Sequence, residues 1–435
     1  MASVDRVISA APQLRLLQID SGKNQYFGVE TMKLIRLLSG LAVLLVIASA
    51  ALAQQAGTGT VKTLKLKSAV LGEERTVLVR TPVGYETNNV RYPVLYMTDG
   101  DAHIGHTAST IDFLMRNGRV ADLIVVGVTN TDRTRDLTPT KSSAKNAAGE
   151  LQFPTSGGSD NFLKFFETEL IPEIEKQYRV QPYRILAGHS LGGLFVVHTM
   201  ISKPGLFHSH IAVSPSLQWE NGETLKHAEE FLKNQKEMKV TLYASIGNET
   251  GGISENFDKF KDLLSKTSIK GFEWQAERMT DEDHGTVVLR SHYFGLRKIY
   301  EGWQAPRDPE SGAVAGGLAG ADAHYKKLSE KFGYSIPTPE NLINIAGYQL
   351  LNGNKPDEAI AVFKTNVERY PASANVYDSL AEAYERGGRI DLAEPLYDKA
   401  RSLGEQNNDP AFAVFRANYE RAHAKLKEAQ ANKKP

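Results

Sequence analysis

The chain has 435 residues, of which 41% are hydrophobic and 23% are charged. This composition excludes disorder along the whole chain and has room for two or three domains. The 51 basic and 51 acidic side chains cancel, which argues against a dedicated nucleic-acid-binding protein. The absence of cysteine excludes disulfides, thiol nucleophiles and thiolate metal sites.

The first recognisable element is a targeting segment at residues 32–53. A basic start is followed by an apolar run at 37–53, with small residues three positions and one position before a cleavage after Ala53. This pattern is typical of a cleaved secretory signal peptide. The alternative, a membrane anchor, is disfavoured because the run is short and contains Ser and Gly. We expect a periplasmic or secreted protein with no stable membrane span after cleavage, a true start at Met32, and a non-native extension at 1–31.

Residues 54–305 are predicted to form one domain, because short apolar runs alternate there with helical patterns. Two alternating runs, at 61–70 and 76–85, predict a hairpin. Buried strands are expected at six further runs: 92–100, 121–130, 183–190, 208–216, 239–248 and 271–275. An apolar face predicts a helix at 160–178. The sequence therefore predicts an α/β fold with a mostly parallel central sheet and helices on both faces.

The strongest chemical signal is the sequence Gly-His-Ser-Leu-Gly at 188–192. A strand-like run precedes it and an apolar helix follows, which is the context of a nucleophilic serine on a sharp strand-to-helix turn. The alternative is a serine in an ordinary glycine-rich turn. We predict Ser190 as the nucleophile, with an oxyanion hole formed by the N–H groups of Leu191 and Asp101, the latter from the loop after the third strand.

A serine nucleophile needs a base, and the base needs an orienting carboxylate, in the chain order Ser, acid, His. His284 lies in a polar loop after the last predicted strand and is the expected base, whereas His292 falls inside the next helix. Glu249 is the first carboxylate after the strand that ends near residue 246, so we predict it as the acid. Asp258 is the fallback.

Two further features are expected to contact substrate. Arg135 and Arg133 follow the fourth strand at its carboxyl end, where ligands bind in such sheets. An arginine there could hold a carboxylate or a catecholate; the alternative is that Arg135 pairs with Asp136 and stiffens the loop. Trp219 could wall the pocket or only pack.

One cluster of acidic and histidine residues is a candidate metal site. Its members have a spacing that could ligate zinc, and they are Asp99, Asp101, His103 and His106. The alternative is that the acids shape the oxyanion loop while the histidines line the next helix. We predict no metal and no cofactor.

The C-terminal part changes character. Residues 306–325 are rich in Gly, Ala and Pro and are predicted to be a linker, and 326–435 a small all-α domain. A pattern of small and aromatic residues recurs at 34 residues and resembles the tetratricopeptide repeat. Helices at 321–332 and 409–429 are expected to support the two units. The repeats could bind a protein partner or mediate self-association.

Several stretches together resemble one family. They are YPVLYMTDGD, RTRDLTPT, YRILAGHSLGGLF, SPSLQW and DHGT, and they are similar to the esterase family of α/β-hydrolases that includes enterochelin and related siderophore esterases, S-formylglutathione hydrolase and the mycolyltransferases. The resemblance covers about residues 60–303 and is closest to the siderophore-esterase-like branch. It implies an α/β-hydrolase fold, and it supports Ser190 and His284 more strongly than Glu249.

The sequence thus predicts an exported serine hydrolase. It would cleave a small-molecule carboxylic ester, of siderophore type, through an acyl-enzyme on Ser190, Glu249 and His284. One alternative is an acyltransferase on the same triad. Another is a protein-binding module built on the repeats, with the hydrolase domain as an accessory. The sequence does not name the ester.

Overall fold

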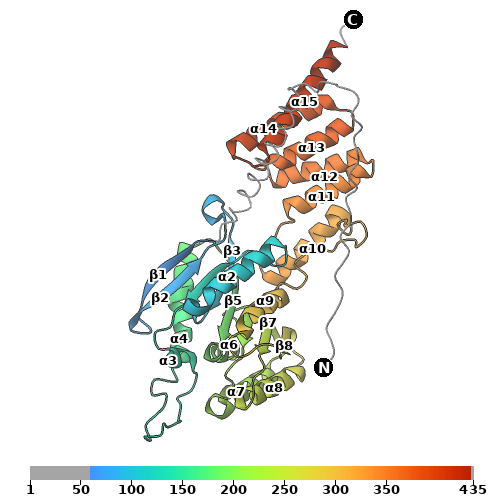
Figure 1. Cartoon of the computed structure of the whole chain (residues 1–435). Coiled ribbons are helices and arrows are strands. Elements are labelled where there is room, and N and C mark those ends of the chain that lie inside the picture. The colour runs from blue at the N-terminus through green and yellow to red at the C-terminus, as the bar shows by residue number, and fades with distance from the viewer. Residues whose placement is uncertain (1–58, 433–435) are drawn as a thin grey trace, which may run out of the picture. The chain divides into compact units, whose positions relative to one another are not determined.

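The computed structural model describes residues 59–432 (Figure 1). The predicted signal peptide at 32–53, the extension at 1–31 and the start at Met32 lie outside the described residues. The described residues belong to one compact unit. Within the described range, no helix is both long enough and apolar enough to cross a bilayer.

An eight-stranded sheet forms the centre of the unit. Its strands are β1 (Val61–Ser68), β2 (Glu73–Arg80), β3 (Tyr92–Met97), β4 (Ile124–Val128), β5 (Val180–His189), β6 (Ser209–Val213), β7 (Glu237–Ile246) and β8 (Lys270–Arg278). Their order in space is β1-β2-β4-β3-β5-β6-β7-β8. β2 is antiparallel to both β1 and β4, whereas all pairs from β4 to β8 are parallel. The predicted hairpin, the six further strands and the mostly parallel sheet are confirmed.

Both faces of the sheet are covered, because successive side chains of a strand point to opposite faces. In β3, Val94 and Tyr96 pack on one side while Leu95 and Met97 pack on the other. The first side is covered by α4 (Ser159–Phe165), the π-helical segment η2 (Phe166–Leu170), α5 (Ile171–Gln177), α6 (Leu191–Ser202), α7 (Glu223–Asn234) and α8 (Gly252–Ser265). α2 (Gly100–Arg116) and α9 (Val287–Ile299) cover the second side. The short α3 (Arg133–Leu137) follows β4, and the one-turn helices η1 (Tyr85–Thr87) and η3 (Trp219–Gly222) lie in loops.

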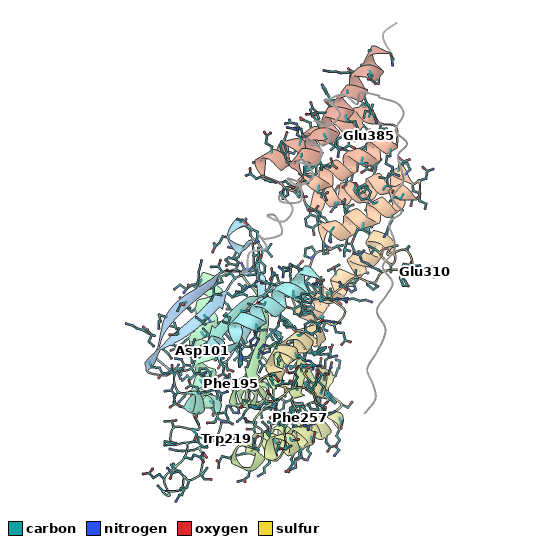
Figure 2. All side chains as sticks on the ribbon, viewed as in Figure 1. Asp101, Phe195, Trp219, Phe257, Glu310 and Glu385 are labelled. Carbon is teal, nitrogen blue, oxygen red and sulfur yellow. The ribbon has the colours of Figure 1, made fainter. Side chains whose placement is uncertain are left out.

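Large aromatic side chains fill the first side of the core. Figure 2 labels two of them, Phe195 on α6 and Phe257 on α8, and both are almost fully buried. The predicted helix at 160–178 is present, as α4, η2 and α5 in succession. Burial of this apolar surface is the main driving force that holds the helices on the sheet.

The C-terminal part consists of helices. They are α10 (Gly317–Phe332), α11 (Glu340–Asn352), α12 (Pro356–Arg369), α13 (Ala374–Arg386), α14 (Ile390–Gln406) and α15 (Phe412–Ala431). α13 and α14 begin 34 residues after α11 and α12, which matches the predicted period. Their identification as tetratricopeptide repeats stays a prediction.

The predicted linker at 306–325 differs from the structure. α10 begins at Gly317 and extends past residue 325, so it crosses the expected boundary with 326–435. Its apolar stripe packs into the same core as α2 and α9: the ring of Phe332 stacks on Tyr300 with 5.0 Å between centroids. α10 therefore belongs to the core on this side of the central sheet.

The carboxyl ends of the parallel strands meet at one edge of the sheet, where ligands bind in open α/β folds. Apart from the fallback Asp258 on α8, the residues predicted for catalysis and substrate contact lie after β3, β4, β5, β6, β7 and β8, in the connecting loops or in the first turns of the helices that follow.

Candidate active site

Ser190 lies on the sharp turn between β5 and α6. Its backbone has φ 60° and ψ −116°, a conformation that costs a non-glycine residue free energy and is typical of functional sites. Neither flanking glycine has room for a side chain. A Cβ on Gly188 would lie 2.4 Å from the carbonyl oxygen of Gly192, and a Cβ on Gly192 would lie 2.3 Å from Thr98 Oγ1. The packing of the turn thus sustains the strain and holds the serine at the edge of the sheet.

His284 and Glu249 come together after β8 and β7. His284 Nδ1 lies 2.9 Å from Glu249 Oε2. The other carboxylate oxygen of Glu249 accepts hydrogen bonds from the Ser214 hydroxyl at 2.5 Å and from the N–H of Gly247 at 3.3 Å. The Glu249 side chain is 8% exposed, whereas that of His284 is 44% exposed. Because the buried Glu249 carboxylate binds Nδ1 of the imidazole, Nε2 is the nitrogen that can accept a proton.

The loops that carry Glu249 and His284 are joined through their main chains. The N–H of Asn248 donates to the carbonyl of Glu282 at 2.6 Å. Gly247 has no room for a side chain, because a Cβ there would lie 2.8 Å from the carbonyl oxygens of Glu282 and Asp283. The distance between Glu249 and His284 is therefore set by backbone contact.

No hydrogen bond joins Ser190 to His284 in the described residues. The Ser190 hydroxyl instead lies 3.3 Å from that of Ser216. The ring of His189, the residue before Ser190, has its centroid 4.6 Å from that of His284. In unliganded enzymes the bond between nucleophile and base is often long and shortens when substrate binds.

The two predicted oxyanion donors both occupy first turns of helices. Leu191 is the first residue of α6 and Asp101 the second of α2, and Figure 2 labels Asp101 at that helix start. N–H groups at these positions have no acceptor within their own helix. The end of β3 approaches the serine turn closely, as the 2.3 Å between Thr98 Oγ1 and a Cβ on Gly192 shows.

The two arginines after β4 have different surroundings. Arg133 donates to Asp99 at 2.6 Å and to the carbonyl of His189 at 3.1 Å, so it joins the ends of β3 and β5 next to Ser190 in the chain. Burial alone would raise the pKa of the Asp99 carboxyl, but hydrogen bonding and charge from Arg133 lower it below its ordinary value. Arg133 is therefore the arginine in contact with the serine turn.

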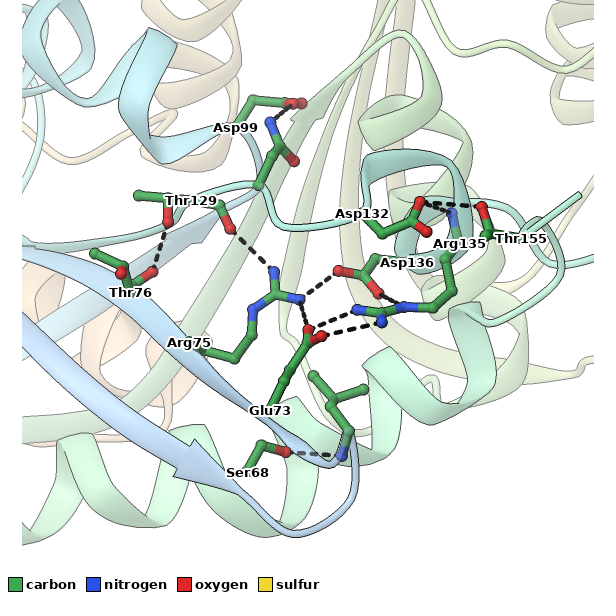
Figure 3. Close-up of polar contacts among 12 residues, drawn as sticks. Ser68, Glu73, Arg75, Thr76, Asp99, Thr129, Asp132, Arg135, Asp136 and Thr155 are labelled. Carbon is green, nitrogen blue, oxygen red and sulfur yellow. Dashed lines mark hydrogen bonds and ion pairs between the residues drawn. The ribbon is translucent and has the colours of Figure 1, made fainter. Parts of the chain in front are cut away.

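Arg135 adopts the alternative arrangement, in which it pairs with Asp136. Its guanidinium donates to Asp136 at 2.7 Å and to both oxygens of Glu73 on β2, as Figure 3 shows. The buried Arg75 donates to the same two carboxylates. Hydrogen bonding from Arg135 in first place lowers the pKa of Glu73. This network fixes α3, and Arg135 as a substrate contact stays a prediction.

Trp219 follows Ser216 and packs against an excursion of the chain between α3 and α4. Its indole N–H donates to the carbonyl of Thr140 at 3.0 Å. Its ring lies 5.3 Å from that of Phe153 by centroids. The next residue, Glu220, accepts from the Ser143 hydroxyl and N–H. Trp219 and Glu220 thus join the loop after β6 to this excursion.

The two histidines of the candidate metal cluster, His103 and His106, pack edge to face. The centroid of His103 lies 5.2 Å from that of His106 and 5.7 Å from that of His189, and Asp99 pairs with Arg133. Across residues 59–432, no group of three or more acidic or histidine side chains has a geometry that could hold a metal ion.

Some residues of the site were not singled out in the sequence. Ser214 donates to Glu249 and has a positive φ of 39°, and the Ser216 hydroxyl contacts that of Ser190. Both lie in the stretch SPSLQW, which gave the only signal. His189 and Gly247 were also not predicted as parts of the site, although each adjoins a predicted site residue or its loop.

The sheet, its strand order and the serine turn define the class of the protein, an α/β-hydrolase. The chain belongs to the esterase family whose description reads "Putative esterase", and the family model matches residues 68–286. It is a carboxylic ester hydrolase.

Individual relatives agree with this assignment. The chain is 29% identical over 216 residues to the ferri-bacillibactin esterase BesA of Bacillus subtilis (strain 168), covering 45% of this chain and 75% of the relative. It is 34% identical over 205 residues to the siderophore enterobactin esterase of Emericella nidulans, covering 38% of this chain and 67% of the relative.

Solved structures share the fold. An IroE-like serine hydrolase from Shewanella oneidensis has a TM-score of 0.59 at 24% identity, covering 79% of this chain and all of that one. The BES protein from Bacillus cereus has a TM-score of 0.51 at 26% identity, covering 56% of this chain and 97% of its own. Because the first match covers more of this chain than the family model does, the shared fold extends beyond that region.

Proposed function

We propose that the protein is a serine esterase in which Ser190 is the nucleophile, His284 the general base and Glu249 the residue that orients it. The observation that carries the proposal is the 2.9 Å contact between His284 Nδ1 and the buried Glu249 carboxylate, formed beside a serine on a strained strand-to-helix turn. An acid–histidine pair at a serine turn is the arrangement that activates a hydroxyl for acyl transfer.

The reaction proceeds through an acyl-enzyme. Ser190 Oγ attacks the ester carbonyl carbon while His284 Nε2 takes the hydroxyl proton, and the N–H groups of Leu191 and Asp101 stabilise the oxyanion. The intermediate collapses, the C–O bond to the alcohol breaks, and the alcohol leaves with the proton from His284. Water then attacks the acyl carbon, His284 again takes and returns the proton, and the carboxylic acid and free serine are released.

The proposed substrate is a small-molecule ester of siderophore type. Support comes from the relatives, whose names describe esterases of ferri-bacillibactin and enterobactin. Arg133, Arg135 and Trp219 are the proposed substrate contacts; a guanidinium suits a catecholate or carboxylate, and an aromatic side chain suits the catechol ring. Arg133 has the stronger support, because it is a third exposed and borders the serine turn.

We further propose that the protein is exported and that it comprises a hydrolase part and a C-terminal helical part. Export rests on the signal-like sequence at 32–53. The division rests on the recurrence of helices at 34 residues after α10, with α10 itself assigned to the hydrolase core. The balanced charge of the chain gives no electrostatic support for a nucleic-acid partner.

The experiment is an ester panel on the full chain and on the Ser190→Ala variant. The panel contains 4-nitrophenyl esters, a catecholate trilactone and an acetylated sugar, with and without added alcohol acceptors. We expect hydrolysis of the nitrophenyl ester and the trilactone by the wild-type chain and none by the variant. Acylated acceptor as the main product would favour the acyltransferase, and a fully active Ser190→Ala variant would reject the proposal.

A further inference from the structure

The residue before the nucleophile makes a direct bond to the residue proposed as the base. His189 Nε2 lies 2.7 Å from the main-chain carbonyl oxygen of His284. A carbonyl oxygen can only accept, so His189 carries the hydrogen on Nε2 and donates it. This bond joins two loops that are 95 residues apart in the chain.

We infer that His189 is a positioning residue that holds the main chain of His284 beside Ser190. The inference rests on the proposed function. Glu249 fixes the orientation of the His284 ring through Nδ1. This contact alone does not fix the position of the His284 main chain relative to Ser190. The bond from His189 fixes the other end of the residue, and because His189 is covalently joined to Ser190, it sets the separation of nucleophile and base directly.

The donor itself is held rigidly, which a positioning residue requires. The His189 carbonyl accepts from Arg133 at 3.1 Å, and the next N–H, that of Ser190, donates to the carbonyl of Val213 at 2.9 Å. The ring of His103 packs edge-on against the His189 ring, with centroids 5.7 Å apart. The imidazole is therefore fixed by its backbone and by a neighbouring side chain.

The state of charge of His189 also suits this role. Burial in first place, and then the charges of His284 and His103, lower its pKa to about 4. His189 therefore stays neutral at neutral pH while His284 takes up the proton of Ser190. Two adjacent positively charged imidazoles, which would disfavour proton transfer to the base, do not arise.

The test compares side chains that differ in reach. The amide nitrogen of Gln occupies roughly the place of Nε2 of His, whereas the shorter Asn reaches only the place of Nδ1. We expect His189→Gln to keep kcat for a 4-nitrophenyl ester within about fivefold of wild type. His189→Asn and His189→Phe should lose about 10- to 100-fold in kcat with KM changed less than about twofold.

Two controls separate the outcomes. His208→Phe replaces a partly buried histidine before the amino end of β6, away from the site, and should match His189→Phe in melting temperature without loss of kcat. His284→Ala tests the proposed function independently: if it stays active, the base assignment fails. If it is inactive but His189→Asn has the kcat of wild type, or the Gln and Asn variants lose equally, the positioning role is wrong.

Discussion

Replacement of Gly247 by Ala tests whether the backbone contact between the acid and base loops sets the catalytic geometry. The added Cβ would lie 2.8 Å from the carbonyl oxygens of Glu282 and Asp283, and ordinary contact begins at 3.4 Å. Both neighbours are main-chain atoms, so the loops must separate by about 0.6 Å. The bond between His284 and Glu249, now 2.9 Å, would lengthen to about 3.5 Å, where hydrogen bonding becomes weak.

A displacement of this size is expected to lower kcat by about 10- to 100-fold, because misplacement of reacting groups by about 1 Å can cost a hundredfold. KM should change little, since the substitution touches no proposed substrate contact. The assay is steady-state hydrolysis of a 4-nitrophenyl ester. Gly205→Ala is the matched control, because a Cβ there meets no heavy atom within 4 Å. Wild-type kcat in Gly247→Ala would refute the reasoning.

Three further predictions follow from the structure. Arg133→Met removes the donor to the carbonyl of His189 and should lower kcat/KM for the ester by about 10- to 100-fold. Gly347→Ala places a Cβ 2.5 Å from the buried ring of Phe363 and should destabilise the C-terminal helices by about 1–3 kcal/mol, as measured by denaturation. The kcat for ester hydrolysis should stay unchanged. Burial lowers the pKa values of His189 and His210 to about 4 and about 3, so the folded state binds fewer protons than the unfolded chain below pH 6.5. The free energy of unfolding should therefore fall as pH drops from about 6.5 towards 4, by a few kcal/mol in total.

Each of these has a contradicting outcome. Unchanged kcat/KM in Arg133→Met would mean that the serine turn does not need this contact. Ester hydrolysis lost together with helix stability in Gly347→Ala would mean that the two parts unfold as one. Asp122, whose pKa burial raises to about 6, opposes the histidines, so denaturation midpoints that rise below pH 6 would show that its effect is larger than theirs.

The sheet was readable from the sequence because buried parallel strands are continuous apolar runs, as in β3, where every residue is buried. The places of the site loops followed, since parallel strands end at one edge. The glycines around Ser190 were also informative, because their spacing reflects atoms that leave no room for a Cβ. Features that depend on local sequence were therefore predictable.

Pairings between distant residues that no motif relates were not predictable. Arg135 meets Glu73, which lies 62 residues earlier, and nothing in its own loop indicates that partner. The bond from His189 to the His284 carbonyl likewise depends on where two loops meet in space. α10 is a different case: a helix was expected at 321–332, but the glycines before residue 321 were assigned to a linker, whereas the helix begins at Gly317.

The most direct test of the central claim is covalent labelling of the full chain with a fluorophosphonate, followed by peptide mapping. The account predicts one adduct, on the peptide that contains Ser190, with ester hydrolysis lost in proportion to labelling and no adduct on Ser190→Ala. An adduct on another residue, or hydrolysis that persists after complete labelling, would contradict it.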